Sequence, residues 1–140
     1  MQKAPSRRPL DPLEGFVALD ESRRVILAGG AGFLGQALAR AFAREGREVV
    51  ILSRRPAPSE GLIRTGGWNG KTVSDWAGEF EGATAVVNLT GRSVACLYTP
   101  ENRKEIIASR VDSVRAIAQA CEQCHEPPPV IVQAASLAIY

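Results

Sequence analysis

The chain has 140 residues, 45% of them hydrophobic, and a formal net charge of +2 at pH 7. This apolar content suffices for one domain with a packed core, and the small net charge predicts no nucleic-acid partner. No apolar run approaches the about 18 residues of a transmembrane helix, and the first residues lack the apolar core of a signal peptide. We therefore expect a cytoplasmic protein without membrane contact.

The first 22 residues carry three prolines and show no sustained hydrophobic period. They predict a partly disordered leader over residues 1–22, followed by a folded domain over residues 23–140. An organelle-targeting role for the leader is disfavoured, because targeting peptides are poor in acids. The leader contains Asp11, Glu14, Asp20 and Glu21.

A glycine-rich turn follows an apolar run that ends at Leu27 and leads into a helical pattern. Two spacings are nested in the turn, Gly30-x-Gly32-x-x-Gly35 and Gly29-x-x-Gly32-x-x-Gly35. Such a turn lets the backbone approach a pyrophosphate and points the helix N-terminus at its charge. The turn therefore predicts dinucleotide binding, and the alternative is a structural turn without a ligand.

A second apolar run, residues 49–52, is followed by Ser53, Arg54 and Arg55. An NAD-selective site usually carries Asp or Glu here, for the ribose 2′-hydroxyl. A carboxylate repels a 2′-phosphate, whereas a guanidinium binds it through two charge-assisted hydrogen bonds. This position favours NADP over NAD, unless the two arginines only solvate a loop.

The middle of the chain predicts shorter elements. Residues 62–64 suit a third strand, residues 73–80 a short helix, and residues 84–89 a buried strand. Trp68 and Trp76 admit a cofactor-stacking interpretation, but we expect them to pack a loop onto the sheet.

Two helices have apolar positions at helical spacing. The first helix is expected to bury Leu34, Leu38 and Phe42. The longest helix begins at Thr99 and is expected to end near His125, because three prolines follow. Its predicted core-facing stripe is Ile107, Val111, Val114, Ala118 and Cys121. Residues 130–132 then predict another buried strand.

Strands that alternate with helices predict an α/β fold with a doubly wound parallel sheet. Ligands bind such a sheet beyond the carboxyl ends of its strands. The marked loops all follow strands and therefore belong to that edge. They are residues 29–35, 53–55, 88–91 and 134–136.

From residue 24 to residue 140 the chain resembles the extended short-chain dehydrogenase/reductases, and within them the nucleoside-diphosphate-sugar epimerase-like branch, also described as NAD-dependent epimerase/dehydratase. The resemblance covers only the N-terminal part of the family domain. It rests on residues 29–35, 53–55, 88–91, 98–103, 109–111 and 133–140.

The resemblance implies a Rossmann fold that binds NADP, with NAD less favoured. The pyrophosphate is expected at the glycine loop, which contains Gly29, Gly32, Phe33, Leu34 and Gly35. The 2′-phosphate is expected at Arg54 or Arg55, and the adenosine side at Leu89, Thr90 and Gly91. Ser53 and Asn88 are further candidate cofactor-binding residues. Ser136 stands four residues before Tyr140, where the family places the Ser or Thr that hydrogen-bonds the substrate oxygen, so it is the candidate catalytic residue.

The chain departs from the family pattern in its proton-transfer pair, a Tyr followed four residues later by a Lys. Tyr98 is followed by Asn102 at that spacing, and Tyr140 is the last residue. A tyrosine without a neighbouring ammonium keeps a pKa near about 10 and transfers protons poorly at neutral pH. We expect the N-terminal portion of a longer domain, inactive alone, whose unpaired apolar sheet edge favours a homodimer.

Two functions remain open. One is an NADP-dependent oxidoreductase or epimerase that acts on a sugar nucleotide or a related carbonyl or hydroxyl substrate. The other is a non-catalytic NADP-binding sensor or protein-interaction module. Residues 121–125 spell the Cys-x-x-Cys-His of haem attachment, but a helix end in an α/β chain does not suit haem, and zinc would lack a ligand. No metal is expected.

Overall fold

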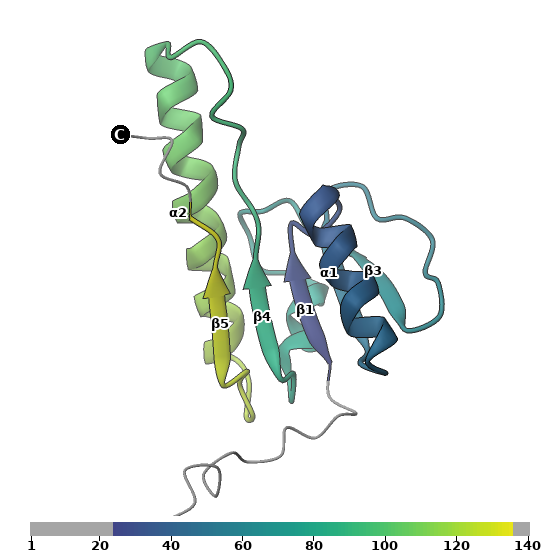
Figure 1. Ribbon diagram of the computed structural model, residues 1–140. Helices are drawn as coiled ribbons and strands as arrows, with labels where there is room; N and C mark the ends of the chain where they lie inside the picture. Colours follow the sequence, from purple (N-terminus) through teal and green to yellow (C-terminus); the bar gives the residue numbers. More distant parts are fainter. Residues whose placement is uncertain (1–23, 136–140) are drawn as a thin grey trace, which may run out of the picture.

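The computed structural model describes residues 24–135, so the expected leader and the candidate catalytic Ser136 lie outside the described residues. Five parallel strands form one sheet in the order β3-β2-β1-β4-β5 (Figure 1). The strands are β1 (Val25–Ala28), β2 (Val49–Ser53), β3 (Ile63–Gly67), β4 (Ala85–Asn88) and β5 (Val130–Gln133). The helices are α1 (Phe33–Arg44), the 3-10 helix η1 (Asp75–Phe80) and α2 (Pro100–Glu122). This arrangement confirms the predicted parallel α/β sheet.

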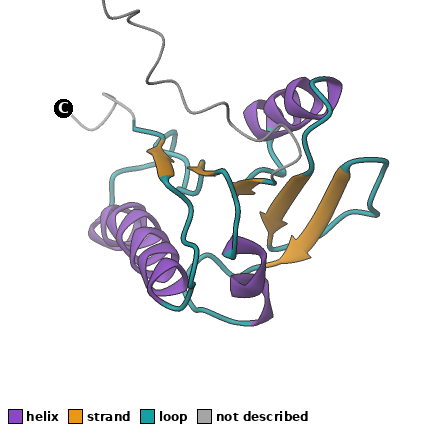
Figure 2. Ribbon diagram, turned by 90° about the horizontal axis from the view of Figure 1, so that it is seen from below, coloured by secondary structure: helices purple, strands orange, loops and turns teal. Residues whose placement is uncertain are grey.

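Helices lie on both faces of the sheet (Figures 1 and 2). On one face, Leu38 and Phe42 of α1 pack against buried side chains of β1 and β2. On the other face, Ile117 of α2 and Phe80 of η1 join Val86 of β4 in a second cluster. β1 and β2 are buried along their whole length, as their continuous apolar runs predict.

The strand register places the ends of the five strands at the same height along the sheet. Ala28 of β1 pairs with Leu52 of β2 and with Asn88 of β4. Leu52 pairs in turn with Gly66 of β3, and Asn88 with Gln133 of β5. The loops that follow the strands therefore gather along the carboxyl edge of the sheet.

α2 begins where the sequence predicts. Thr99 is the N-cap, and its side chain accepts a hydrogen bond from the Asn102 N–H at 3.2 Å. Pro100 stands at the first helical position, and Glu101 places an acid in the first turn. Each of these features satisfies or complements the unpaired N–H groups of a helix start.

The predicted buried face of α2 is wrong except at Cys121, which packs against the core. Ile107, Val111 and Val114 are exposed by 63%, 44% and 47%. The face toward the core carries a neighbouring set, Ile106, Ser113, Ala116, Ile117 and Ala120. Most of the observed buried positions precede a predicted one by one residue, so the buried face is rotated by about 100° around the helix axis from the predicted face. Ser113 is polar and fully buried on this face, and its Oγ accepts a hydrogen bond from Asn88 Nδ2 at 3.1 Å.

Two other burial predictions are wrong. Leu34 was expected in the core but is 55% exposed, because the first turn of α1 extends past the end of β1 (Figure 1). β5 was expected to be buried, but Val130, Ile131 and Val132 are exposed by 44%, 52% and 48%. β5 lies at the edge of the described sheet, so it has a strand neighbour on one side only. The homodimer expected through this edge stays a prediction.

The boundaries of three elements shift slightly. β3 runs over Ile63–Gly67 rather than residues 62–64. The short helix expected over residues 73–80 is a 3-10 helix that begins at Asp75. The long helix ends at Glu122, before the expected His125.

Four charged side chains meet at the amino edge of the sheet. Arg64 donates from Nη1 and Nη2 to the two carboxylate oxygens of Glu79, both at 2.9 Å, and from Nε to Glu48 at 2.7 Å. Arg24 donates to Glu79 at 3.0 Å. The Arg64 hydrogen bonds hold the pKa of Glu79 below its ordinary value. The group ties the starts of β1 and β2 to β3 and η1.

Within residues 24–135, no helix is both long enough and apolar enough to cross a membrane.

Candidate functional site

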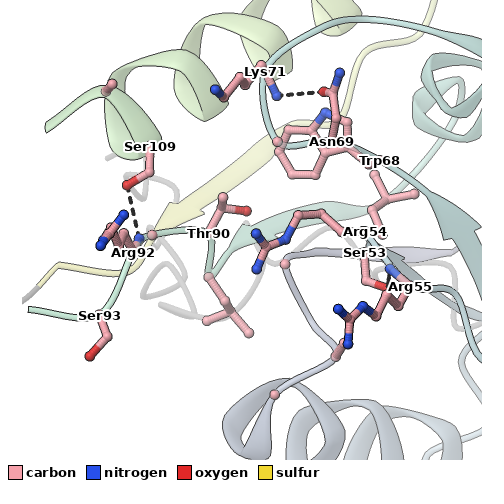
Figure 3. Close-up of a pocket in the computed structure, with 18 of the residues that line it drawn as sticks. Ser53, Arg54, Arg55, Trp68, Asn69, Lys71, Thr90, Arg92, Ser93 and Ser109 are labelled. Carbon is pink, nitrogen blue, oxygen red and sulfur yellow. Dashed lines mark hydrogen bonds between the residues drawn. The ribbon is translucent and has the colours of Figure 1, made fainter. Parts of the chain in front are cut away.

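A pocket of about 1040 Å³ opens at the carboxyl edge of the sheet, where the loops after β1, β2, β3 and β4 face the first half of α2 (Figure 3). Much of its lining was predicted from the sequence, namely Gly29, Gly32, Ser53, Arg54, Arg55, Leu89, Thr90 and Gly91. Ala31 of the glycine turn and Trp68, for which packing was preferred over cofactor stacking, also line the pocket. The residues that sequence reasoning missed are Leu52, Asn69, Gly70, Lys71, Arg92, Ser93, Glu105, Ala108 and Ser109.

Three of the four glycines of the turn have different surroundings. A Cβ on Gly29 would lie 2.6 Å from Thr90 Oγ1, and Gly29 has φ +72°, a conformation that favours glycine. A Cβ on Gly35 would lie 2.1 Å from the carbonyl oxygen of Gly30. A Cβ on Gly32 would meet nothing within 4 Å. Gly29 and Gly35 therefore allow close packing of the protein on itself, whereas Gly32 borders open space.

The start of α1 presents free donors beside that open space. Gly32 is the N-cap and has no side chain to cap the helix, and the first helical bond runs from Gln36 N–H to the Gly32 carbonyl at 2.9 Å. The N–H groups of Phe33, Leu34 and Gly35 therefore have no helical carbonyl partner. Unpaired N–H groups and the helix dipole together favour an anion.

Three of the predicted glycine-loop residues, Phe33, Leu34 and Gly35, do not line the pocket. The Phe33 side chain is 93% exposed and that of Leu34 is 55% exposed, both outside the pocket lining. Gly35 is buried against the turn. These three residues can contribute backbone N–H groups to the site rather than side chains.

Arg54 and Arg55 form the cationic wall of the pocket. Ser53 is nearly buried, and its Oγ accepts the N–H of Arg55 at 3.2 Å, which fixes the turn that presents both arginines. Within residues 24–135, neither guanidinium takes part in an ion pair or a side-chain hydrogen bond. Figure 3 shows the two arginines on one side of the pocket and Arg92 and Ser109 on the other. The paired donors of a guanidinium match the geometry of a phosphate.

The loop after β3 supplies a wall that the sequence did not reveal. Asn69 Oδ1 accepts the N–H groups of Lys71 and Thr72 at 2.8 and 2.9 Å, so the side chain fixes a tight turn. Trp68 is only 5% exposed, and its ring centroid lies 5.2 Å from that of Trp76. The expectation that both tryptophans pack is confirmed, and Trp68 also lines the pocket.

Asn88, predicted to contact the cofactor, is fully buried and does not line the pocket. Its Oδ1 accepts the N–H of Thr90 at 3.0 Å. Its Nδ2 donates to Ser113 at 3.1 Å and to Gln133 at 2.7 Å. Asn88 therefore positions the loop that holds Thr90, and its location corrects the predicted role.

The α2 wall is held to the loop after β4 by polar contacts. The Arg92 N–H donates to Ser109 Oγ at 2.9 Å, and Nη2 donates to Asn102 Oδ1 at 2.8 Å. Arg92 also forms an ion pair with Glu105. Its charge is thus partly compensated within the protein, unlike the charges of Arg54 and Arg55.

Cys121 and Cys124, at and just after the end of α2, are partly buried. Cys121 and Cys124 pack against the core cluster beside Ile117, and burial raises the pKa of each thiol. In the part of the chain that the structure describes, no three His, Cys, Asp or Glu side chains come together in an arrangement that suits a metal ion.

The sequence matches the NAD dependent epimerase/dehydratase family over residues 25–140. The chain belongs to this family. The epimerase family protein SDR39U1 of Homo sapiens is 32% identical over 120 residues, which cover 84% of this chain and 38% of that protein. The epimerase family protein YfhF of Bacillus subtilis (strain 168) is 29% identical over 125 residues, covering 83% of this chain and 38% of YfhF. The chain thus spans 38% of the length of both relatives.

Solved structures show the same fold. The crystal structure of human SDR39U1 (isoform 2) with NADPH superposes with a TM-score of 0.65 at 29% identity, covering 84% of this chain and 38% of that one. Uronate dehydrogenase from Agrobacterium tumefaciens has a TM-score of 0.65 at 19% identity, covering 83% of this chain and 41% of that one. This second likeness concerns the fold alone.

Proposed function

We propose that this chain is the NADP-binding portion of an NAD(P)-dependent epimerase/dehydratase-like oxidoreductase. The observation that carries the proposal is the pair Arg54 and Arg55, which stands without ion-pair partners among residues 24–135 on the wall of the carboxyl-edge pocket. An acid at this place would select NAD, and two guanidiniums suit the additional phosphate of NADP. The NADPH in the human SDR39U1 structure supports the same cofactor.

The remaining pocket fits a dinucleotide. The N–H groups at the start of α1 would hold the pyrophosphate, and the open space at Gly32 leaves room for it. Leu89, Thr90 and Gly91 would line the adenosine side. The cofactor, when bound, supplies hydride transfer. Ser136 would polarise the oxygen of a sugar nucleotide or a related carbonyl or hydroxyl substrate.

A second candidate function is a non-catalytic NADP-binding sensor or interaction module. Tyr98 is followed four residues later by Asn102 rather than by Lys, so these two residues do not form a Tyr-Lys proton-transfer pair. The Asn102 side chain is committed to structure, because Nδ2 donates to the Leu97 carbonyl and Oδ1 accepts from Arg92. Hydride transfer to substrate by a longer form of the protein would decide for the enzyme.

The test is a titration of the chain with NADPH and NADH in parallel. Loss of a charge-assisted hydrogen bond costs about 1.5–3 kcal/mol, or about 10–150-fold in Kd. We expect wild type to prefer NADPH and the double variant Arg54→Ala/Arg55→Ala to lose that preference. The matched control, Arg40→Ala/Arg44→Ala, removes the same charge from the exposed surface of α1 and should keep it. Equal affinity for both cofactors in wild type would contradict NADP selectivity.

A further inference from the structure

The first half of α2 forms one wall of the pocket. Figure 1 shows the start of this helix beyond the carboxyl ends of the strands. Four of the five buried residues of α2 lie within residues 113–120, in the half that packs on the sheet. Asn102, Glu105 and Ser109 of the first half are spaced by three and four residues and therefore share one helical face. All three contact Arg92, in the loop after β4.

Two neighbouring residues of α2 hold the backbone of Arg92. Ser109 Oγ accepts the Arg92 N–H at 2.9 Å and donates to the Ile106 carbonyl at 3.0 Å, so its proton and a lone pair are both used. Arg110 Nη1 donates to the Arg92 carbonyl at 3.3 Å and to the Ile106 carbonyl at 2.9 Å. Arg92 is therefore fixed to the helix by its N–H and by its carbonyl.

The Arg110 guanidinium also packs against Gly91. A Cβ on Gly91 would lie 3.3 Å from Arg110 Cζ and 3.4 Å from Nη2, so glycine lets the loop approach the guanidinium closely. Gly91, Arg92 and Ser109 line the pocket, whereas Arg110 does not. Arg110 can therefore affect a ligand in the pocket only through the loop that it holds, or through its charge.

We infer that Ser109 and Arg110 are positioning residues for the adenosine side of the cofactor, acting through Gly91 and Arg92. The inference rests on the proposed NADP site, in which the loop after β4 lines the adenosine. When either contact to Arg92 is lost, the loop is less ordered before binding, and the cofactor has to order it. NADPH and NADH share the adenosine, so both should bind more weakly by the same factor. This equal loss distinguishes the two residues from the arginines after β2, whose replacement should weaken NADPH selectively.

The experiment is a titration of the whole chain with NADPH and with NADH. We expect Arg110→Ala to bind each cofactor about fivefold more weakly and to keep the ratio of the two affinities within about twofold of wild type. The matched control, Arg103→Ala, removes the same charge from an exposed position of the same helix and should change neither affinity. Ser109→Ala should show the same equal loss, and Ser109→Thr, which keeps the hydroxyl, should restore both affinities.

A circular-dichroism melt of each variant measures its stability. Glu79→Gln, which removes ion pairs at the amino edge, should leave both affinities unchanged, so lower stability alone would not explain a loss in Arg110→Ala. If Arg110→Ala does not fold, the two Ser109 variants decide.

Wild-type affinities for both cofactors in Arg110→Ala and Ser109→Ala would overturn the inference. So would a loss confined to NADPH, which would show that Arg110 acts through its charge on the 2′-phosphate. Equal affinities of the wild type for NADPH and NADH would contradict the proposed NADP selectivity, but the equal loss expected for the variants would still test the inference. If the wild type binds neither cofactor, the proposed site is wrong, and the inference falls with it.

Discussion

Replacing Gly32 by alanine should separate cofactor binding from folding. Gly32 has φ −78° and ψ −178°, an extended conformation open to any residue, and a Cβ there would meet nothing within 4 Å. Alanine is a poorer N-cap than glycine, by about 0.5–1 kcal/mol. We therefore expect Gly32→Ala to lower the melting temperature by at most about 4–8 °C.

The effect on cofactor binding should be larger. The added methyl group would occupy the space beside the free N–H groups of Phe33 and Leu34, where the pyrophosphate is proposed to bind. Loss of one hydrogen bond to a charged group costs about 1.5–3 kcal/mol, so the Kd for NADPH should rise about 10–150-fold. A fluorescence titration with NADPH, paired with a thermal melt, measures both quantities on one sample.

Gly35→Ala is the matched comparison. Its Cβ would lie 2.1 Å from the Gly30 carbonyl oxygen and 2.4 Å from the Gly30 carbonyl carbon, so the backbone of the turn would have to move. Overpacking of this kind costs about 1–3 kcal/mol or more, and we expect a clear loss of thermal stability. The reasoning is refuted if Gly32→Ala binds NADPH as wild type does, or if it loses as much stability as Gly35→Ala.

Two further predictions concern stability. Glu79→Gln should lower the free energy of unfolding at pH 7 by about 1–2 kcal/mol in urea denaturation, while Glu60→Gln, on an exposed loop, should change nothing. Hydrogen bonds from Arg64 hold the pKa of Glu79 below its ordinary 4.5. The stability that the Glu79 carboxylate contributes is therefore present above pH 4.5 and should disappear as the pH falls through the lowered pKa. A difference in unfolding free energy between wild type and Glu79→Gln that stays constant down to about pH 2 would contradict this prediction. Asn88→Ala should cost about 2–4 kcal/mol in the same assay, because Thr90, Ser113 and Gln133 lose their partner, and a loss below about 1 kcal/mol would show that water replaces the side chain.

The sequence predicted the parts of the site that depend on local chain geometry. A strand, a glycine turn and a helix follow one another within 20 residues, so their relation is set by short-range sterics. The arginines after β2 could be placed because the end of that strand was identified correctly. The loop after β3 was missed because β3 was expected to end at Arg64, whereas it ends at Gly67. Had its end been placed there, the same carboxyl-edge rule would have added Trp68 and Lys71 to the site.

The orientation of α2 could not be read from the sequence. Ile106 and Ile107 are neighbours of equal hydrophobicity, and each begins an apolar series along the helix. The series that faces the sheet also contains a polar residue, Ser113, which is hydrogen-bonded to Asn88. A buried serine has no hydrophobic signal, so a pattern of apolar residues selects the wrong face. Asn88 was predicted to bind the ligand because it ends a strand at the carboxyl edge, but its side chain is fully buried and hydrogen-bonded within the protein.

Two pairs of arginines at opposite edges of the sheet differ in their partners, whereas Arg92 at the carboxyl edge is paired with Glu105. At the amino edge, Arg24 and Arg64 are bound by Glu48 and Glu79, and their charges are compensated within the fold. At the carboxyl edge, Arg54 and Arg55 have no such acids among residues 24–135. An ion pair at a half-exposed surface adds only modestly to the free energy of unfolding. Unpaired guanidiniums at a pocket instead attract a phosphate electrostatically, over a range limited by the Debye length of the solution. Because Glu48 and Glu79 lie at the opposite edge, their carboxylates do not compete with a ligand phosphate for Arg54 and Arg55. The fold therefore separates the charges that hold its strands together from those available to bind the cofactor.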